Sequence, residues 1–318
     1  MRRLHAALTG VFLLGSALQA TEPATKIYPL ASKTLILDVA AAGGALVAVG
    51  DRGFILRSAN GGESWAQQAS PVNVMLTAVR MRDAMTGWAV GHDAVILKTD
   101  DGGTSWDVKF QDAKLETPLF DIWFENDQHG IAVGGYGLLQ ETTDGGATWT
   151  ERRISEDELH LYTIAPLPDG SLITVGEAGA IFKSADKGAT WTKVASPYEG
   201  TFFGALVLKD GGVLIYGLRG NLFRSDDAGK SWTKIESGTE TSLLGAAQWV
   251  GGGVVVVGLS GTVLTSADGR AFTHAVLPDR EALGGAVESG EGKMLVFGEK
   301  GAHTLTLGAP NFNGAVKQ

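Results

Sequence analysis

The sequence contains no cysteine, which excludes disulfide bonds, iron–sulfur clusters, thiol chemistry and cysteine-ligated zinc. Proline is also scarce, with 9 residues against 45 glycines, and this balance favours tight hairpins over disordered segments. After residue 20 no run of 18 apolar residues occurs, so we expect the mature chain to have no transmembrane helix.

Basic residues are too few to balance the acidic ones, and the formal net charge is −9. An acidic surface argues against nucleic acid and anionic lipid as partners. The histidines beyond the first 20 residues are scattered without the spacing of metal ligands, and neither a nucleophile elbow nor a phosphate-binding loop occurs. We therefore expect no metal, no cofactor and no catalytic residue.

Residues 1–20 have the pattern of a secretory signal peptide. Arg2 and Arg3 form a basic start, residues 6–14 are apolar, and small residues precede Thr21. Cleavage is expected after Ala20, with Ala17 as the alternative, and an uncleaved anchor is the competing interpretation. The pattern predicts a periplasmic or secreted protein.

The rest of the chain repeats seven times, at intervals of 40 to 43 residues. A short apolar segment ends in glycine in every unit, at Gly50, Gly91, Gly134, Gly176, Gly217, Gly258 and Gly298. An aromatic residue follows in the first six units, at Trp65, Trp106, Trp149, Trp191, Trp232 and Phe272. Repeats of this length indicate stacked supersecondary units that bury a hydrophobic face only against their neighbours.

The second unit reads as four short strands. Residues 76–81 alternate between apolar and polar, and the segments 88–91, 94–99 and 104–108 follow, separated by turn residues. Four antiparallel strands per unit are typical of a propeller blade. The sequence thus predicts an all-β, seven-bladed β-propeller that forms a single domain over residues 21–318, and we expect a monomer.

We interpret the seventh unit as running from Gly284 to Leu307, without an aromatic hairpin or a fourth strand of its own. Residues 26–30 resemble the ends of the fourth strands in the other units, as in residues 191–197. We therefore predict that this N-terminal strand completes the last blade and leaves no open edge.

The third hairpin of blades two to five follows the pattern Ser/Thr-x-Asp-x-Gly-x-Ser/Thr-Trp, which we call the Asp box. Its Asp and Trp are expected to be structural in the four full matches, at Asp101, Trp106, Asp144, Trp149, Asp186, Trp191, Asp227 and Trp232. Blade one has Asn60 in place of the Asp, and blade six is one residue shorter. Calcium binding is the alternative, but each box offers only one or two carboxylates.

The corner after each repeated glycine lies on the face opposite the Asp boxes. Corner residues differ from blade to blade, whereas the Asp boxes are near copies, so we place partner binding on this corner face. The candidate binding residues are Arg52, His92, Tyr136, Glu177 and Arg219. The alternative interpretation is that each is an ordinary solvated turn residue.

The repeated Trp88-Ala89-Val90-Gly91 followed by the Asp box resembles the photosystem II stability/assembly factor propellers and their non-photosynthetic bacterial relatives. The resemblance covers blades one to six. The resemblance implies an assembly or scaffold role on the far side of a membrane, with a membrane-associated protein as the partner.

The rival interpretation is a glycoside hydrolase or carbohydrate-binding propeller of the sialidase type, because the Asp box also occurs there. Such an enzyme needs three arginines that bind a carboxylate and a Tyr–Glu nucleophile pair, and the sequence does not assemble the three arginines. A glycosidase that uses two carboxylates is a further alternative, with Asp51, Glu177 and Glu299 as its acids. Arg80 and Arg82 are placed at the far end of their strand from the corner. We favour a non-catalytic binding platform.

Overall fold

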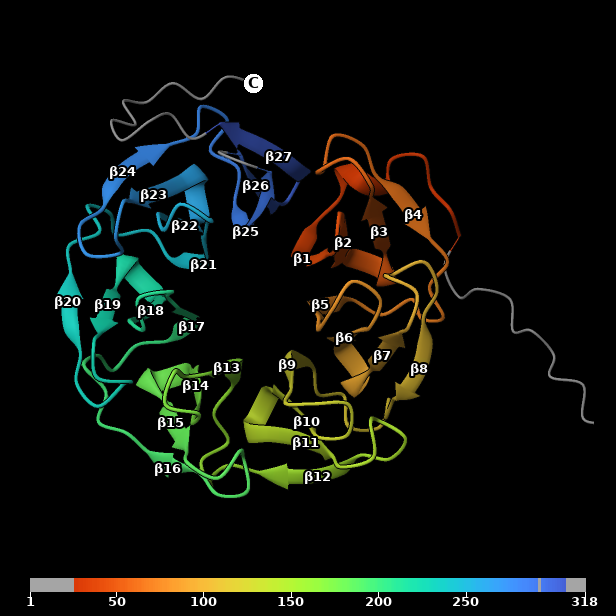
Figure 1. Cartoon of the computed structure of the whole chain (residues 1–318), viewed down its shortest axis with the longest axis horizontal. Coiled ribbons are helices and arrows are strands. Elements are labelled where there is room, and N and C mark those ends of the chain that lie inside the picture. Colours follow the sequence, from red (N-terminus) through yellow and green to blue (C-terminus); the bar gives the residue numbers. More distant parts are fainter. Residues whose placement is uncertain (1–25, 291–292, 307–318) are drawn as a thin grey trace, which may run out of the picture.

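The protein, described here from a computed structural model over residues 26–290 and 293–306, is a ring of seven antiparallel sheets around a central opening (Figure 1). Blades one to six each have four strands, and the described part of blade seven has three. The first strand of each blade lies nearest the opening, and the later strands lie progressively farther out. The predicted seven-bladed all-β fold is confirmed.

The strands of blades one to three run in chain order from the centre outward. They are β1 (Ile36–Ala42), β2 (Ala45–Gly50), β3 (Ile55–Ser58), β4 (Ala66–Gln68), β5 (Leu76–Met81), β6 (Gly87–Gly91), β7 (Ile96–Thr99), β8 (Asp107–Phe110), β9 (Leu119–Phe124), β10 (Gly130–Gly134), β11 (Leu138–Thr142) and β12 (Thr150–Arg153).

Blades four to seven follow the same order. They contain β13 (Leu161–Pro166), β14 (Leu172–Gly176), β15 (Ile181–Ser184), β16 (Thr192–Lys193), β17 (Phe202–Val207), β18 (Val213–Gly217), β19 (Leu222–Ser225), β20 (Thr233–Ile235), β21 (Leu243–Gln248), β22 (Val254–Gly258), β23 (Thr262–Ser266), β24 (Thr273–Val276), β25 (Leu283–Gly290), β26 (Lys293–Gly298) and β27 (Gly301–Thr306).

Short 3₁₀ turns are the only helical elements in the described residues. They are η1 (Ala31–Lys33), η2 (Asp51–Gly53), η3 (His92–Ala94), η4 (Gly135–Gly137), η5 (Glu177–Gly179), η6 (Leu218–Gly220) and η7 (Leu259–Gly261). No helix in this part of the chain is long and apolar enough to span a membrane. Turns η2 to η7 form the corners of blades one to six.

The second strand of each blade is buried on both faces, because neighbouring blades cover it from either side. All five residues of β22, Val-Val-Val-Val-Gly, are buried, and β6, β10, β14 and β18 show the same pattern. A strand covered on both faces has a continuous apolar sequence rather than an alternating one. This explains why the Val-Gly segments were the clearest repeat in the sequence.

The glycine that ends each second strand is required by space. A Cβ on Gly50 would lie 2.1 Å from the carbonyl oxygen of Leu35, and one on Gly91 would lie 2.2 Å from that of Met75. The φ of Gly50 is 179°, an extended value open to any residue. The inner strand of the blade therefore approaches too closely for any side chain.

The Asp-box hairpins share one hydrogen-bond pattern. In blade two, Thr99 Oγ1 donates to Asp101 Oδ1 over 2.8 Å, and the same hydroxyl accepts the N–H of Gly103 over 3.0 Å. Asp101 Oδ1 and Oδ2 then accept the N–H and hydroxyl of Ser105. In blade one, Asn60 Oδ1 takes the place of the Asp oxygen and accepts the N–H of Ser64. The hairpin thus needs an oxygen acceptor at this position and does not need its charge.

We expect the Asp boxes to make stability sensitive to acid. Thr148 donates hydrogen bonds from its hydroxyl and its backbone N–H to Asp144, and Thr190 does the same to Asp186. These hydrogen bonds, the hydroxyl's first, lower the pKa of each carboxyl from the ordinary 3.8 to about 2. Because the folded pKa is lower than the unfolded one, the stabilisation is complete above about pH 4 and disappears as the pH falls through about 2. The Tm, measured by differential scanning calorimetry, should fall steeply over that interval.

The matched variant for this test is Asp144→Asn/Asp186→Asn, since Asn60 shows that an amide fits the hairpin. Its Tm should fall less steeply below about pH 4 than that of the unaltered protein. Identical acid slopes for the two proteins would contradict the role assigned to these carboxylates.

The predicted pairing of residues 26–30 with the last blade is wrong. The segment lies against blade one, where Tyr28 N–H donates to Gln67 Oε1 and Gln67 Nε2 donates to the carbonyl of Lys26. Pro29 has no N–H to offer a sheet, and the chain turns at Tyr28, whose carbonyl accepts the N–H of Ala31. This turn leads into η1, so the segment does not extend along β27.

The ring is closed by side-chain packing between blades one and seven. Leu295 and Phe297 of β26 share one buried cluster with Ile36, Val39 and Leu46 of β1 and β2. The expected signal peptide lies outside the described residues and stays a prediction.

Candidate functional site

The middle residue of the corner turn is exposed in five of blades one to six, and in blade two Asp93 is half-buried while His92 is exposed. The middle residue of each corner turn has a left-handed φ, between 50° and 57°, at Arg52, Asp93, Tyr136, Ala178, Arg219 and Ser260. The glycine or alanine that follows is buried, while Arg52 has 72% of its side chain exposed. A left-handed backbone at a non-glycine residue is uncommon, and here it turns the side chain out of the ring.

The predicted binding residues divide between two positions of the corner. Arg52, Tyr136 and Arg219 occupy the middle position, whereas His92 and Glu177 occupy the first. They come from five consecutive blades, so they form part of a ring rather than a compact cluster.

The structure brings two of them together around His160. Tyr136 N–H donates to His160 Nδ1 over 3.0 Å, and the two ring centroids are 4.8 Å apart. Glu177 Oε2 accepts the N–H of His160 over 3.3 Å. The link before β13 therefore joins the corners of blades three and four.

An aromatic row that sequence reasoning missed continues from this cluster. Phe120, Tyr162 and Phe203 are the second residues of β9, β13 and β17, and their ring centroids are 5.0 Å and 5.5 Å apart in sequence order. Each inner strand has a register shift at this residue, and such a bulge re-aims a side chain. The signal was an aromatic at the same place in three successive repeats.

The row does not have the chemistry of a sialidase-type nucleophile. Burial, and then the negative charge of Glu177, raise the pKa of Tyr162 above the ordinary value for tyrosine. A tyrosine nucleophile of that type needs a hydrogen-bonded base, and no hydrogen bond joins Tyr162 to Glu177 among the described residues. No arginine of the described residues has an ion pair with Glu177 or a ring contact with this row.

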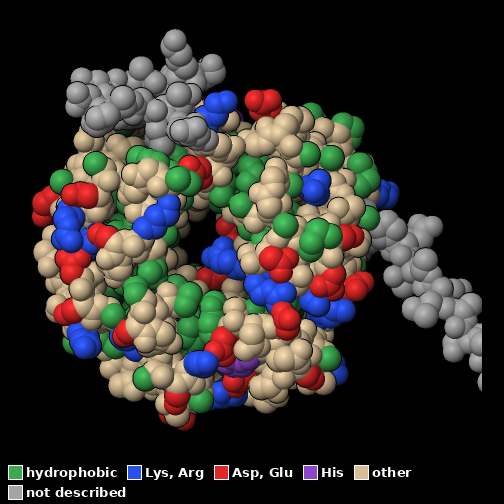
Figure 2. Space-filling model, viewed as in Figure 1, with side chains coloured by type: hydrophobic (Ala, Val, Ile, Leu, Met, Phe, Trp, Pro, Cys, Tyr) green, Lys and Arg blue, Asp and Glu red, His purple; other side chains and the backbone are tan. Residues whose placement is uncertain are grey.

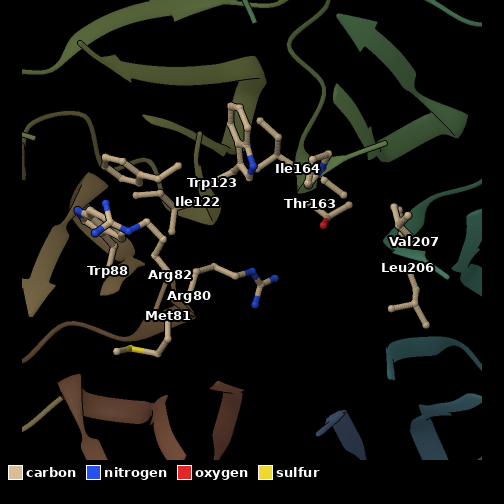
Figure 3. Close-up of a pocket in the computed structure, with 14 residues that line it drawn as sticks. Arg80, Met81, Arg82, Trp88, Ile122, Trp123, Thr163, Ile164, Leu206 and Val207 are labelled. Carbon is tan, nitrogen blue, oxygen red and sulfur yellow. The ribbon is translucent and has the colours of Figure 1, made fainter. Parts of the chain in front are cut away.

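A second group of polar residues lies on the inner strands of blades one to three. Arg80 pairs through Nη1 with Asp38 Oδ2 at 2.8 Å and through Nη2 with Asp121 Oδ1 at 3.0 Å. Asp38, Arg80 and Asp121, which we call the channel triad, come from three consecutive blades. Figure 3 shows Arg80 extending from β5 into the open space at the centre of the ring.

The carboxylates of the channel triad also bind backbone. Asp38 accepts the N–H of Val79 on the next blade, and Asp121 accepts the N–H of Ile164 and the hydroxyl of Thr163 on its next blade. Burial raises the pKa of Asp38, against the opposing effect of Arg80. Burial alone would lower the pKa of Arg80, but Asp121 and Asp38 together raise it. The triad therefore ties blades one to four together and keeps Arg80 charged.

In blade five, a tyrosine hydroxyl takes the place of the Asp121 carboxylate and binds the backbone of the next blade. Gly204 occupies the position of Asp121, and a Cβ there would lie 2.3 Å from the hydroxyl of Tyr216. That hydroxyl accepts the N–H of Ala246 on the next blade, and burial raises its pKa strongly. The missing side chain at Gly204 thus makes room for a tyrosine from the neighbouring strand.

A hollow of about 350 Å³ opens beside the channel triad, toward the Asp-box ends of β5, β9, β13 and β17. Trp88 stacks on Phe124 in its wall, with ring centroids 3.6 Å apart, and Arg82 lies 5.9 Å from the Trp88 centroid. Arg80 and Arg82 line the hollow together with mostly apolar residues, and both carboxylates of the channel triad already accept several hydrogen bonds. On the face drawn in Figure 2, acidic and basic side chains are mixed, with basic ones at the edge of the opening.

Within residues 26–290 and 293–306, no three His, Asp or Glu side chains are grouped so as to hold a metal ion.

The sequence profile of the family described as photosynthesis system II assembly factor YCF48 matches residues 21–117 and 107–257, most of the chain. The chain belongs to the YCF48 family.

Solved structures with the same fold include YCF48 bound to a D1 peptide, which is 19% identical and has a TM-score of 0.72 over 90% of this chain and 97% of that one. YCF48 from Cyanidioschyzon merolae is 18% identical, with a TM-score of 0.69 over 88% and 97% of the two chains. No curated protein matches the chain.

Some propellers of similar shape are enzymes. The virginiamycin B lyase from Staphylococcus aureus is 11% identical, with a TM-score of 0.73 over 85% of this chain and 94% of that one. At such identities the likeness shows the fold alone. Assignment to the YCF48 family therefore rests on the sequence profile, and the shared propeller fold does not select between binding and catalysis.

Proposed function

We propose that the protein is an exported, non-catalytic platform that holds a segment of a membrane-associated protein during assembly. Membership of the YCF48 family supports the assembly role, and the YCF48 structure with a D1 peptide supports peptide binding by this fold. The signal-peptide pattern of residues 1–20 supports export.

The observation that carries the proposal is the corner face of blades three to five. Tyr136, which is 49% exposed, leads through His160 to the aromatic row of Phe120, Tyr162 and Phe203. Aromatic residues and arginine dominate the binding energy of protein interfaces. Arg219, on the corner of blade five, is exposed and adds a guanidinium, the group best suited to bind a partner's carboxylate with two hydrogen bonds.

The proposal is tested by capture of the partner from detergent-solubilised membranes with the mature protein as bait. The variant Tyr136→Ala/Arg219→Ala should reduce capture about tenfold or more, because both residues are placed at the centre of the interface. The partner is identified by mass spectrometry, and its affinity is then measured with synthetic segments of its sequence. The mass of the purified bait also shows whether cleavage follows Ala20 or Ala17.

Two control variants, checked for an unchanged Tm, locate the interface. Lys187→Ala/Lys230→Ala removes two exposed basic residues from the Asp-box face and should leave capture unchanged. Arg52→Ala/His92→Ala alters the corners of blades one and two and should have a smaller effect than the first variant. Loss of capture only with Lys187→Ala/Lys230→Ala would place the interface on the Asp-box face and contradict the proposal. Release of sugar from a synthetic glycoside by the mature protein would show that it is an enzyme and contradict the non-catalytic proposal.

A further inference from the structure

The outer edge of β27 is the open edge of the described ring. The third strand of every other blade pairs with a fourth strand, and β27 pairs with β26 alone among the described residues. The N-terminal segment lies along blade one and approaches β27 at Gly301, where a Cβ would lie 2.1 Å from the carbonyl oxygen of Ser32. An unpaired strand edge is a template for another strand, and native proteins cover it.

The residues that follow β27 repeat the residues that follow β23. In blade six, Ser266 ends the third strand, Phe272 follows six residues later, and the fourth strand ends in Ala275-Val276. Forty residues farther along the chain, Thr306 is followed by Phe312 and Ala315-Val316. The same interval separates Gly258 from Gly298, so the two segments are in register with the repeat.

Among the described residues, the core between blades six and seven has no aromatic residue from an Asp box, unlike its counterparts. Trp106, Trp149, Trp191, Trp232 and Phe272 each pack against the core shared with the preceding blade, and Trp65 packs against the core shared by blades seven and one. In the core of Val257, Leu283 and Val296, the described residues include no aromatic from an Asp box. Phe312 is the residue that the repeat would supply.

We infer that residues 312–317 dock on the outer edge of β27 as the fourth strand of blade seven. Twelve residues, 307–318, follow the end of β27, and the six-residue step from Thr306 to Phe312 equals the hairpin step of blade six. Blade six pairs Thr262 with Val276 and Val263 with Ala275. Transposed by one repeat, Ala302 lies opposite Val316, and Phe312 covers the core between blades six and seven.

Disulfide trapping tests the register directly, because the chain has no cysteine of its own. In Ala302→Cys/Val316→Cys the two thiols are directly opposite, so mild oxidation should form an intramolecular disulfide, seen as loss of both free thiols in a monomer. The control Ala302→Cys/Ala315→Cys differs by one position, which turns the second thiol to the other face of the sheet, and it should oxidise at least tenfold more slowly. Equal rates, or a disulfide between two molecules in the first variant, would overturn the inference.

Hydrogen exchange gives a second measurement without cysteines. The amides of β27 should exchange at least tenfold faster in a chain that ends at Thr306 than in the full chain, while the amides of β22 stay unchanged. The variant Phe312→Ala should accelerate exchange in β27 to an intermediate extent. Equal exchange of β27 in the full and shortened chains would show that these residues do not cover the edge.

Discussion

Replacement of Trp106 by alanine is expected to lower the free energy of unfolding by about 3–5 kcal/mol, the usual cost of removing a buried tryptophan. Trp106 is 7% exposed, and its indole N–H donates to the carbonyl of Gly103. The ring packs with Val47 and Val49 of blade one and with Leu97 of its own blade. The substitution thus leaves a cavity between two blades, and urea unfolding followed by fluorescence measures the loss.

The other Asp-box tryptophans provide the control, since Trp149, Trp191 and Trp232 are only partly buried. Trp191→Ala should cost less than Trp106→Ala, because less apolar surface leaves water when Trp191 packs. Trp106→Phe retains most of the ring volume and should cost least. If Trp106→Ala and Trp191→Ala were equally stable, burial between blades would not be what makes these residues structural.

Replacement of Asp121 by alanine is expected to have a comparable effect, about 3 kcal/mol, because it removes a buried carboxylate and leaves its backbone donors unpaired. Only 1% of Asp121 is exposed, and its carboxylate accepts the N–H groups of Ile122 and Ile164 besides binding Arg80. The alanine leaves these donors buried without an acceptor. Thermal and urea unfolding both measure the effect.

Asp121→Asn keeps an oxygen acceptor and loses the charge, so it should retain part of the stability that alanine loses. Asp38→Ala is the second comparison, and it should cost less because the side chain of Asp38 is 17% exposed and partly solvated. An Asp121→Ala protein as stable as the unaltered one would show that the channel triad does not hold the blades together.

The repeat predicted the blades well because each of its signals has a local cause. The strand predicted at residues 76–81 has the same bounds as β5. The recurrent glycine marks the place where the backbone of the inner strand comes too close for a side chain. The Asp box closes its hydrogen bonds within seven residues, so its pattern is complete in the sequence.

The contacts between blades could not be predicted in the same way. Arg80 was placed at the far end of its strand, but its partners Asp38 and Asp121 lie about one repeat away on either side, and only the ring brings them together. The aromatic row was missed because a bulge breaks the simple alternation of strand residues. Residues 26–30 were aligned by Pro29 and the apolar residues around it, although the segment turns along blade one instead.

The corners of the ring have a consequence for engineering. Each middle residue already has the left-handed backbone, and Arg, Asp, Tyr, Ala and Ser all occur there in this one chain. Exchange among such side chains should leave the core untouched, since five of the six are exposed. The six corners are therefore positions that can be varied while the blades stay the same. A combinatorial library confined to them would redirect the propeller to new partners without redesign of its blades.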